Sequence, residues 1–183
     1  MKEIPKVLPD VRIWLGGPEV SYRAEEILKL FPEVEGVMRG EGEETFLELT
    51  GCWTADAQLR DVRGITWRME NGEIASNPDR QVIDLSRVPF VYGQIEDFRN
   101  RIVYYESSRG CPFSCSYCLS SVDKCLRFRD IELVKEELQF FIDHEVPQVK
   151  FVDRTFNCRH DHAMTVWKYI SEHDRGITNF HFE

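Results

Sequence analysis

Three of the six cysteines in this 183-residue chain lie close together in the sequence. Cys111, Cys115 and Cys118 have a C-x3-C-x2-C spacing, and thiolates this close together can converge on one point only if the backbone loops around that point. Such a loop is typical of a metal site or an iron–sulfur cluster. Three ligands on a cluster of four irons leave one iron open, whereas a purely structural site is normally closed by a fourth ligand. The spacing therefore predicts a centre with an open coordination position.

Two other uses of these thiols are weighed beside this one. Cys125 follows the motif and could complete a four-cysteine zinc site or a closed cluster, although zinc sites usually pair their ligands as two C-x2-C units. A disulfide framework is the other alternative. The chain has no secretory signal, so its cysteines fit a reduced compartment better.

The motif, with Tyr117 directly before its last cysteine, resembles the signature of the radical S-adenosylmethionine enzymes. The resemblance implies that Cys111, Cys115 and Cys118 hold a 4Fe-4S cluster and that S-adenosylmethionine binds the open iron. It further implies reductive cleavage of that cofactor to a 5′-deoxyadenosyl radical, with Tyr117 beside the adenine. The protein's part in such chemistry is to position the cofactor and exclude water.

Composition narrows the partners of the chain. A net charge of −9 and a pI near 5.1 argue against a nucleic-acid partner, because no broad basic face is available. No apolar run approaches the roughly 20 residues that a membrane-spanning helix needs. The N-terminus has no targeting segment, and we expect a cytoplasmic protein.

The elements that must position the motif alternate between strand and helix over residues 102–183. A strand at 102–106 leads to the cysteines, Asp130 is the expected N-cap of the next helix, and strands at 148–152 and 178–182 flank a helix over 161–173. This order predicts the first half of a β/α barrel, whose ligands lie at the carboxyl ends of the strands.

Several side chains near this edge could take part in the chemistry. Asp153 ends the second barrel strand, and the family resemblance implies that it receives the amino group of S-adenosylmethionine; the alternative is a turn cap or a partner of Arg154. Ser107, Ser108 and Arg109 are candidate donors to the cluster or the cofactor, or an ordinary loop. Cys158, His160 and His162 lie close together in the sequence and could bind a metal ion. The alternative is that these residues stand at the start of a helix, where such side chains usually cap the helix or face solvent.

The first 60 residues read as part of an open parallel α/β domain. A strand at 11–15 ends at Gly16 and Gly17, a helix is expected over 20–31, and Arg39–Glu44 follows a second strand. These glycines and Gly40-Glu41-Gly42-Glu43 are similar to the later part of the cobalamin-binding domain that precedes the radical domain in one subfamily. The resemblance places Gly16 and Gly17 against the corrinoid. The Asp-x-His-x-x-Gly element of that domain is absent, so we expect a fragment.

The fold class expected is thus α/β: residues 1–60 form part of a cobalamin-binding-like domain, 61–101 a hairpin around Asn71-Gly72 and a linker, and 102–183 the truncated barrel. We expect an enzyme fragment that is inactive by itself. The sequence identifies no catalytic acid or base. Its cofactors would be the cluster, S-adenosylmethionine and, in a longer protein, cobalamin. Partners would be a small-molecule substrate, a flavodoxin or ferredoxin and, through open sheet edges, a second copy.

The reaction class is left open by the sequence. The resemblance covers anaerobic magnesium-protoporphyrin IX monomethyl ester cyclases, methyltransferases and methylthiotransferases. The alternative from another class is an iron–sulfur or zinc module without catalysis.

Overall fold

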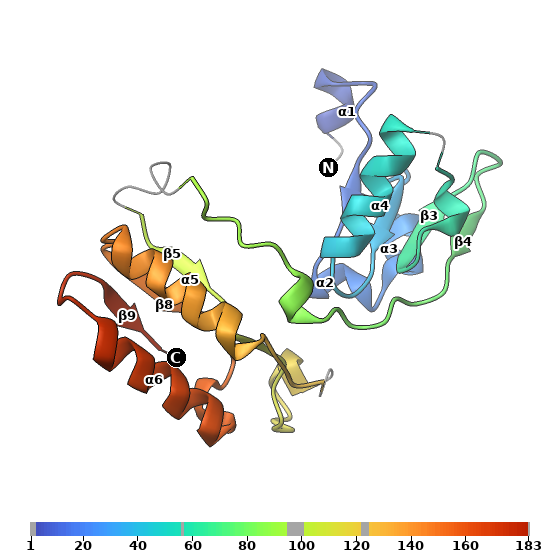
Figure 1. Cartoon of the computed structure of the whole chain (residues 1–183). Helices are drawn as coiled ribbons and strands as arrows, with labels where there is room; N and C mark the ends of the chain where they lie inside the picture. The colour runs from blue at the N-terminus through green and yellow to red at the C-terminus, as the bar shows by residue number, and fades with distance from the viewer. Residues whose placement is uncertain (1–2, 56, 95–100, 122–124, 183) are drawn as a thin grey trace. The chain divides into compact units, whose positions relative to one another are not determined.

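A computed structural model describes residues 3–55, 57–94, 101–121 and 125–182 (Figure 1). The chain divides into two compact units, residues 1–83 and 84–183. None of the described helices is long and apolar enough to cross a membrane.

The first unit is built on a four-stranded sheet with the order β1-β2-β3-β4. Its strands are β1 (Trp14–Leu15), β2 (Gly36–Met38), β3 (Ile65–Arg68) and β4 (Ile74–Ser76). β1 and β2 are parallel, as the strand–helix alternation predicts. β3 and β4 are antiparallel to their neighbours, with Val37 opposite Thr66 and Trp67 opposite Ala75. The hairpin around Asn71-Gly72 therefore extends the sheet of this unit, because β3 pairs directly with β2.

The helices of this unit are α1 (Ile4–Val7), α2 (Pro18–Ser21), α3 (Ala24–Leu30), α4 (Glu43–Thr54) and the 3-10 turn η1 (Leu59–Asp61). The single helix expected over 20–31 is wrong, because α2 and α3 are separate. The Ser21 hydroxyl donates to the carbonyl of Gly17 at 2.8 Å, a local bond that competes with helix continuation, and Arg23 leaves the helical conformation.

A small apolar core holds the first unit together. Leu28 on α3, Val34 before β2 and Val37 on β2 have no exposed surface, and Ile13 and Ala24 pack beside them. Leu49 on α4 and Ile65 on β3 are buried as well. Helix α3 thus packs its buried residues Ala24 and Leu28 against this core, whereas α1 and α2 contribute no buried residue.

The second unit has a parallel sheet with the order β5-β8-β9. Its strands and helices are η2 (Leu85–Arg87), β5 (Val103–Tyr105), β6 (Ser108–Arg109), η4 (Leu119–Ser121), β7 (Arg127–Phe128), α5 (Ile131–Asp143), β8 (Gln148–Phe151), η5 (Phe156–Cys158), α6 (His160–His173) and β9 (Asn179–His181). The expected strand, helix, strand, helix, strand order is confirmed. So is the Asp130 N-cap, whose carboxylate accepts from the backbone N–H groups of Glu132 and Leu133.

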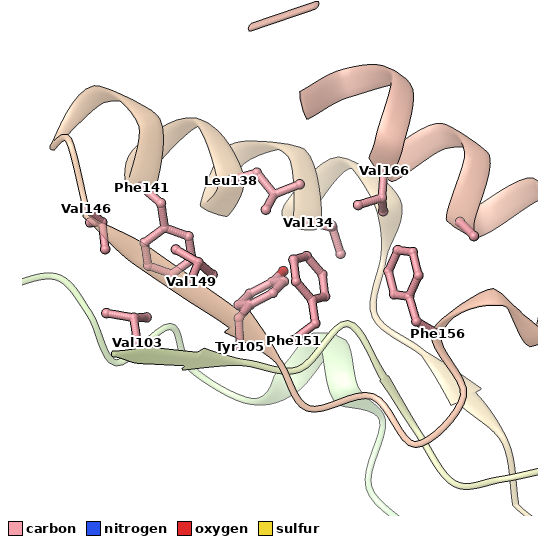
Figure 2. Packing of buried hydrophobic residues seen from close by; sticks show 11 residues of the cluster. Val103, Tyr105, Val134, Leu138, Phe141, Val146, Val149, Phe151, Phe156 and Val166 are labelled. Carbon is pink, nitrogen blue, oxygen red and sulfur yellow. The ribbon is translucent and has the colours of Figure 1, made fainter. Parts of the chain in front are cut away.

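Alternation along these strands explains which face is buried. On β5, Val103 and Tyr105 are buried, whereas Tyr104 between these two residues is exposed. On β8, Val149 and Phe151 are buried in the same alternating pattern. Figure 2 shows these buried side chains directed toward Val134, Leu138 and Phe141 of α5. The helices therefore cover one face of the sheet, and the strand ends are left to position the loops that follow them.

Candidate metal and cofactor site

The cysteine loop is closed at its base by a two-stranded ribbon. β6 and β7 are antiparallel, with Ser108 opposite Phe128 and Arg109 opposite Arg127. Gly110 follows β6 with a φ of +97°, and a Cβ there would lie 2.5 Å from the carbonyl oxygen of Cys125. Only glycine fits this position without strain, because both the φ angle and the close backbone exclude a side chain.

The three motif cysteines lie on the loop that this ribbon closes. Cys115 is exposed, and Cys111 and Cys118 are half-buried. The backbone N–H of Cys118 donates to the carbonyl of Cys115 at 3.1 Å, so the second half of the motif is a tight turn. Three thiols are therefore presented on one short surface segment that follows β5 and β6, at the carboxyl end of the sheet.

Cys111 is also in contact with the loop that follows β8. Its sulfur lies 3.5 Å from the hydroxyl oxygen of Thr155. This hydrogen bond, with a smaller contribution from a backbone bond at Phe113 and the charge of Arg154, lowers the pKa of the Cys111 thiol. The thiolate is the form that ligates metals, so the environment of Cys111 favours ligation. Burial instead raises the pKa of nearby Cys158.

A buried polar network lies directly beneath this loop. The Asp153 carboxylate accepts from the hydroxyls of Ser107 at 2.9 Å and Ser108 at 2.5 Å, and from the backbone N–H of Ser107 at 3.2 Å. All three residues are at most 2% exposed. Burial raises the pKa of Asp153, and the serine bonds oppose that rise. Asp153 therefore joins the end of β8 to the segment that leads into the cysteines.

His162 of α6 completes this network. Its Nε2 lies 3.1 Å from the Ser107 hydroxyl, and its Nδ1 lies 3.5 Å from a guanidinium nitrogen of Arg159. Because the carboxylate can only accept, Ser107 donates to Asp153 and His162 donates through Nε2–H to Ser107. Nδ1 then accepts from Arg159. Burial, and next the charge of Arg159, lower the pKa of His162, in agreement with a neutral ring.

The other residues that the sequence singled out lie in different surroundings. Tyr117 is 91% exposed beside Cys118. In the first unit, Gly17 has a φ of +95° and open space where a Cβ would be, and it precedes Pro18 at the start of α2. Gly16 is tighter, since an added Cβ would lie 3.3 Å from the Met38 side chain.

Within the described part of the chain, no three His, Cys, Asp or Glu side chains converge to hold a metal ion. The donor set nevertheless fits an iron–sulfur cluster, because three thiols share one loop and one of them favours the thiolate. Within the same described residues, the side chains of Cys158, His160 and His162 do not converge to form a metal site.

The ribbon and the network were absent from the expectations drawn from the sequence. The ribbon pairs residues 18 and 20 positions apart, and each strand contributes only two residues, too few for a period to show. The network joins three segments through Ser107, Asp153 and His162. The one available signal was the pair of serines before the motif.

Relatives in sequence cover most of this chain. An uncharacterized methyltransferase, PH0819, of Pyrococcus horikoshii is 29% identical over 92% of the chain. The anaerobic magnesium-protoporphyrin IX monomethyl ester cyclase of Rubrivivax gelatinosus is 30% identical over 77%, and the cobalamin-dependent radical SAM methyltransferase TokK of Streptomyces tokunonensis 27% over 85%. The chain spans 39%, 28% and 25% of their lengths. No protein-family model matches it.

Solved structures share the fold. OxsB, a cobalamin-dependent S-adenosylmethionine radical enzyme solved with aqua-cobalamin and S-adenosylmethionine, superposes with a TM-score of 0.69 at 22% identity, over 92% of this chain and 25% of its own. The methyltransferase TsrM of Kitasatospora setae, solved with cobalamin and a [4Fe-4S] cluster, gives 0.69 at 19% identity, over 93% and 36%. The α/β fold class expected from the sequence is confirmed, and the chain is related to the cobalamin-dependent radical S-adenosylmethionine enzymes.

Proposed function

We propose that this chain provides the cluster-binding part of a radical S-adenosylmethionine enzyme, with Cys111, Cys115 and Cys118 as the ligands of a 4Fe-4S cluster. The observation that carries the proposal is the presentation of three thiols on one loop, closed by β6 and β7 at the carboxyl end of β5. When bound, the cluster supplies the electron that cleaves S-adenosylmethionine to a 5′-deoxyadenosyl radical. The residues of the chain hold the cluster, place the cofactor and limit access of water.

Tyr117 and Asp153 have different roles around the cofactor in this proposal. The exposed ring of Tyr117, next to the last ligand, is available to cover the adenine. Asp153 stays a proposed acceptor for the amino group of the cofactor, and in the structure its Oδ1 accepts from the hydroxyls of Ser107 and Ser108 and its Oδ2 from the backbone N–H of Ser107. We propose that it also holds the segment that enters the cysteine loop.

The first unit supports a proposal of cobalamin binding in a longer protein. Gly16 and Gly17 follow β1, and a Cβ added at Gly17 would meet open space at the start of α2, so a flat ligand could approach the backbone there. The relative TokK and the structural neighbours OxsB and TsrM are cobalamin proteins by name or bound ligand. The domains proposed remain a cobalamin-binding-like part, a hairpin with its connection, and half a barrel.

The reaction proposed is methyl transfer or oxidative cyclisation of a small molecule, since the relatives named above carry those activities. A low-potential donor such as flavodoxin or ferredoxin would supply the electron, in a reducing cytoplasm that suits six free thiols. We further propose that open strand edges at β5 and β9 allow weak dimers of this chain.

Iron and sulfide analysis after anaerobic reconstitution tests the ligand assignment. Cys111→Ala, Cys115→Ala and Cys118→Ala should each lose most of the cluster, because two thiolates cannot retain it. Cys52→Ala, on α4 of the first unit, is the matched control and should load like the wild type. If Cys125→Ala also loses the cluster, the centre is closed by four cysteines and the proposal of an open iron is wrong.

A further inference from the structure

Thr155 is the polar side chain of the β8–α6 connection that contacts a sulfur of the motif. Its hydroxyl oxygen lies 3.5 Å from the sulfur of Cys111, within hydrogen-bonding range for sulfur. Either atom can donate while the cysteine is a thiol. A thiolate bound to iron has no hydrogen, so in the loaded protein the hydroxyl of Thr155 must be the donor.

The contact is held from both sides by the buried network. Ser107 and Ser108, shortly before Cys111, are bonded to Asp153, which lies two residues before Thr155. The backbone N–H of Cys158 donates to the carbonyl of Thr155 at 3.1 Å and fixes the turn that contains it. Buried groups therefore anchor the chain within a few residues of both Cys111 and Thr155.

We propose that Thr155 tunes the reduction potential of the cluster by donating a hydrogen bond to the sulfur of Cys111. The proposal rests on the function proposed above and adds a residue that the motif does not contain. A donor to a ligand sulfur withdraws charge from it and so stabilises the reduced, more negative cluster, which raises the potential. Thr155 is a positioning and tuning residue, because it contacts the ligand and not the substrate.

The test compares Thr155→Val with the wild type in a redox titration of the reconstituted full chain, followed by electron paramagnetic resonance. Valine keeps the shape but removes the donor, so the midpoint potential should become more negative. Thr155→Ser keeps a hydroxyl and should return the potential toward the wild-type value. Thr165→Val is the matched control, since the Thr165 hydroxyl donates to the carbonyl of Asp161 on α6, and it should leave the potential unchanged.

The outcomes separate this inference from the function on which it rests. If the wild type takes up no cluster, both are wrong. If the wild type loads and Thr155→Val has the same potential as Thr165→Val, Thr155 does not tune the cluster, although the ligand assignment stands. Thr155→Ala, which removes the hydroxyl without β-branching, gives the same comparison if the valine variant does not fold, as judged by circular dichroism.

Discussion

His162 shows how one buried side chain can report on the site without touching the cysteines. It is 2% exposed, and its ring is fixed between Arg159 and Ser107. A neutral ring is required, because Nδ1 accepts from a guanidinium while Nε2–H donates to a hydroxyl that itself donates to Asp153. Protonation at Nδ1 would place two positive groups in contact and would break this chain of donors.

The free energy of unfolding should therefore fall as the pH is lowered through the range of His162. Its pKa is lowered in the folded chain, so its contribution is present above the unfolded value of 6.5 and is lost as the pH falls toward the folded value. One such group changes stability by at most about 1.4 kcal/mol per pH unit. Urea unfolding at pH 7.5 and 5.5 should show a smaller decrease for His162→Gln, which keeps a donor to Ser107, than for the wild type.

The exposed His160 provides the control for this measurement, because it lies in the same helix and carries no comparable burial. His160→Gln should keep the wild-type dependence on pH. Asp153 and its serine donors are present in every variant, and the glutamine at position 162 keeps a donor to Ser107. Equal decreases for the wild type and His162→Gln would show that the ring is not held neutral by its surroundings.

Helix α5 is attached to the rest of its unit by charge as well as by its apolar face. The guanidinium of Arg129, just before the helix, bonds the Glu137 carboxylate, with one distance of 2.5 Å, and donates to the carbonyls of Leu85 and Val88. Tyr105 on β5 donates to the same carboxylate at 2.6 Å. Arg129 and Glu137 are 8% and 7% exposed, so this buried pair links a strand, a helix and the segment around η2.

Removing one member of this pair should be costly. Arg129→Met leaves the Glu137 charge buried without its partner, and we expect a loss of about 3–5 kcal/mol in the free energy of unfolding. Lys135→Met is the control, because the Lys135–Glu132 pair lies at the surface of the same helix and should contribute about 0–1 kcal/mol. Urea unfolding of the two variants gives the comparison. Similar small losses in both would mean that the buried pair does not hold α5.

The elements of the fold were predictable where the signal is local. The Asp130 cap, the Asn71-Gly72 turn and the apolar stripe of α5 each depend on residues within a few positions of one another. The same holds for the cysteine spacing. The β6–β7 ribbon and the bonds of Asp153 to Ser107 and Ser108 join residues 18 to 46 positions apart, and residue types alone do not reveal such pairings.

The molecule as a whole contains two units, each with its own apolar core. Leu28 in the first and Leu138 in the second have no exposed surface. Either change to alanine should cost about 2–5 kcal/mol in its own unit. We expect Leu138→Ala to reduce the amount of cluster retained at moderate urea, while Leu28→Ala leaves it unchanged, as iron analysis and hydrogen exchange would show. Equal loss in both variants would contradict the assignment of the cluster to the second unit alone.

The most direct test of the whole account is electron paramagnetic resonance of the anaerobically reconstituted, reduced chain with and without S-adenosylmethionine. An open iron held by Cys111, Cys115 and Cys118 predicts a 4Fe-4S signal whose g values change when the cofactor is added, in the wild type and in Cys125→Ala alike. A signal that is the same with and without S-adenosylmethionine, or a colourless protein that binds only zinc, would contradict the account.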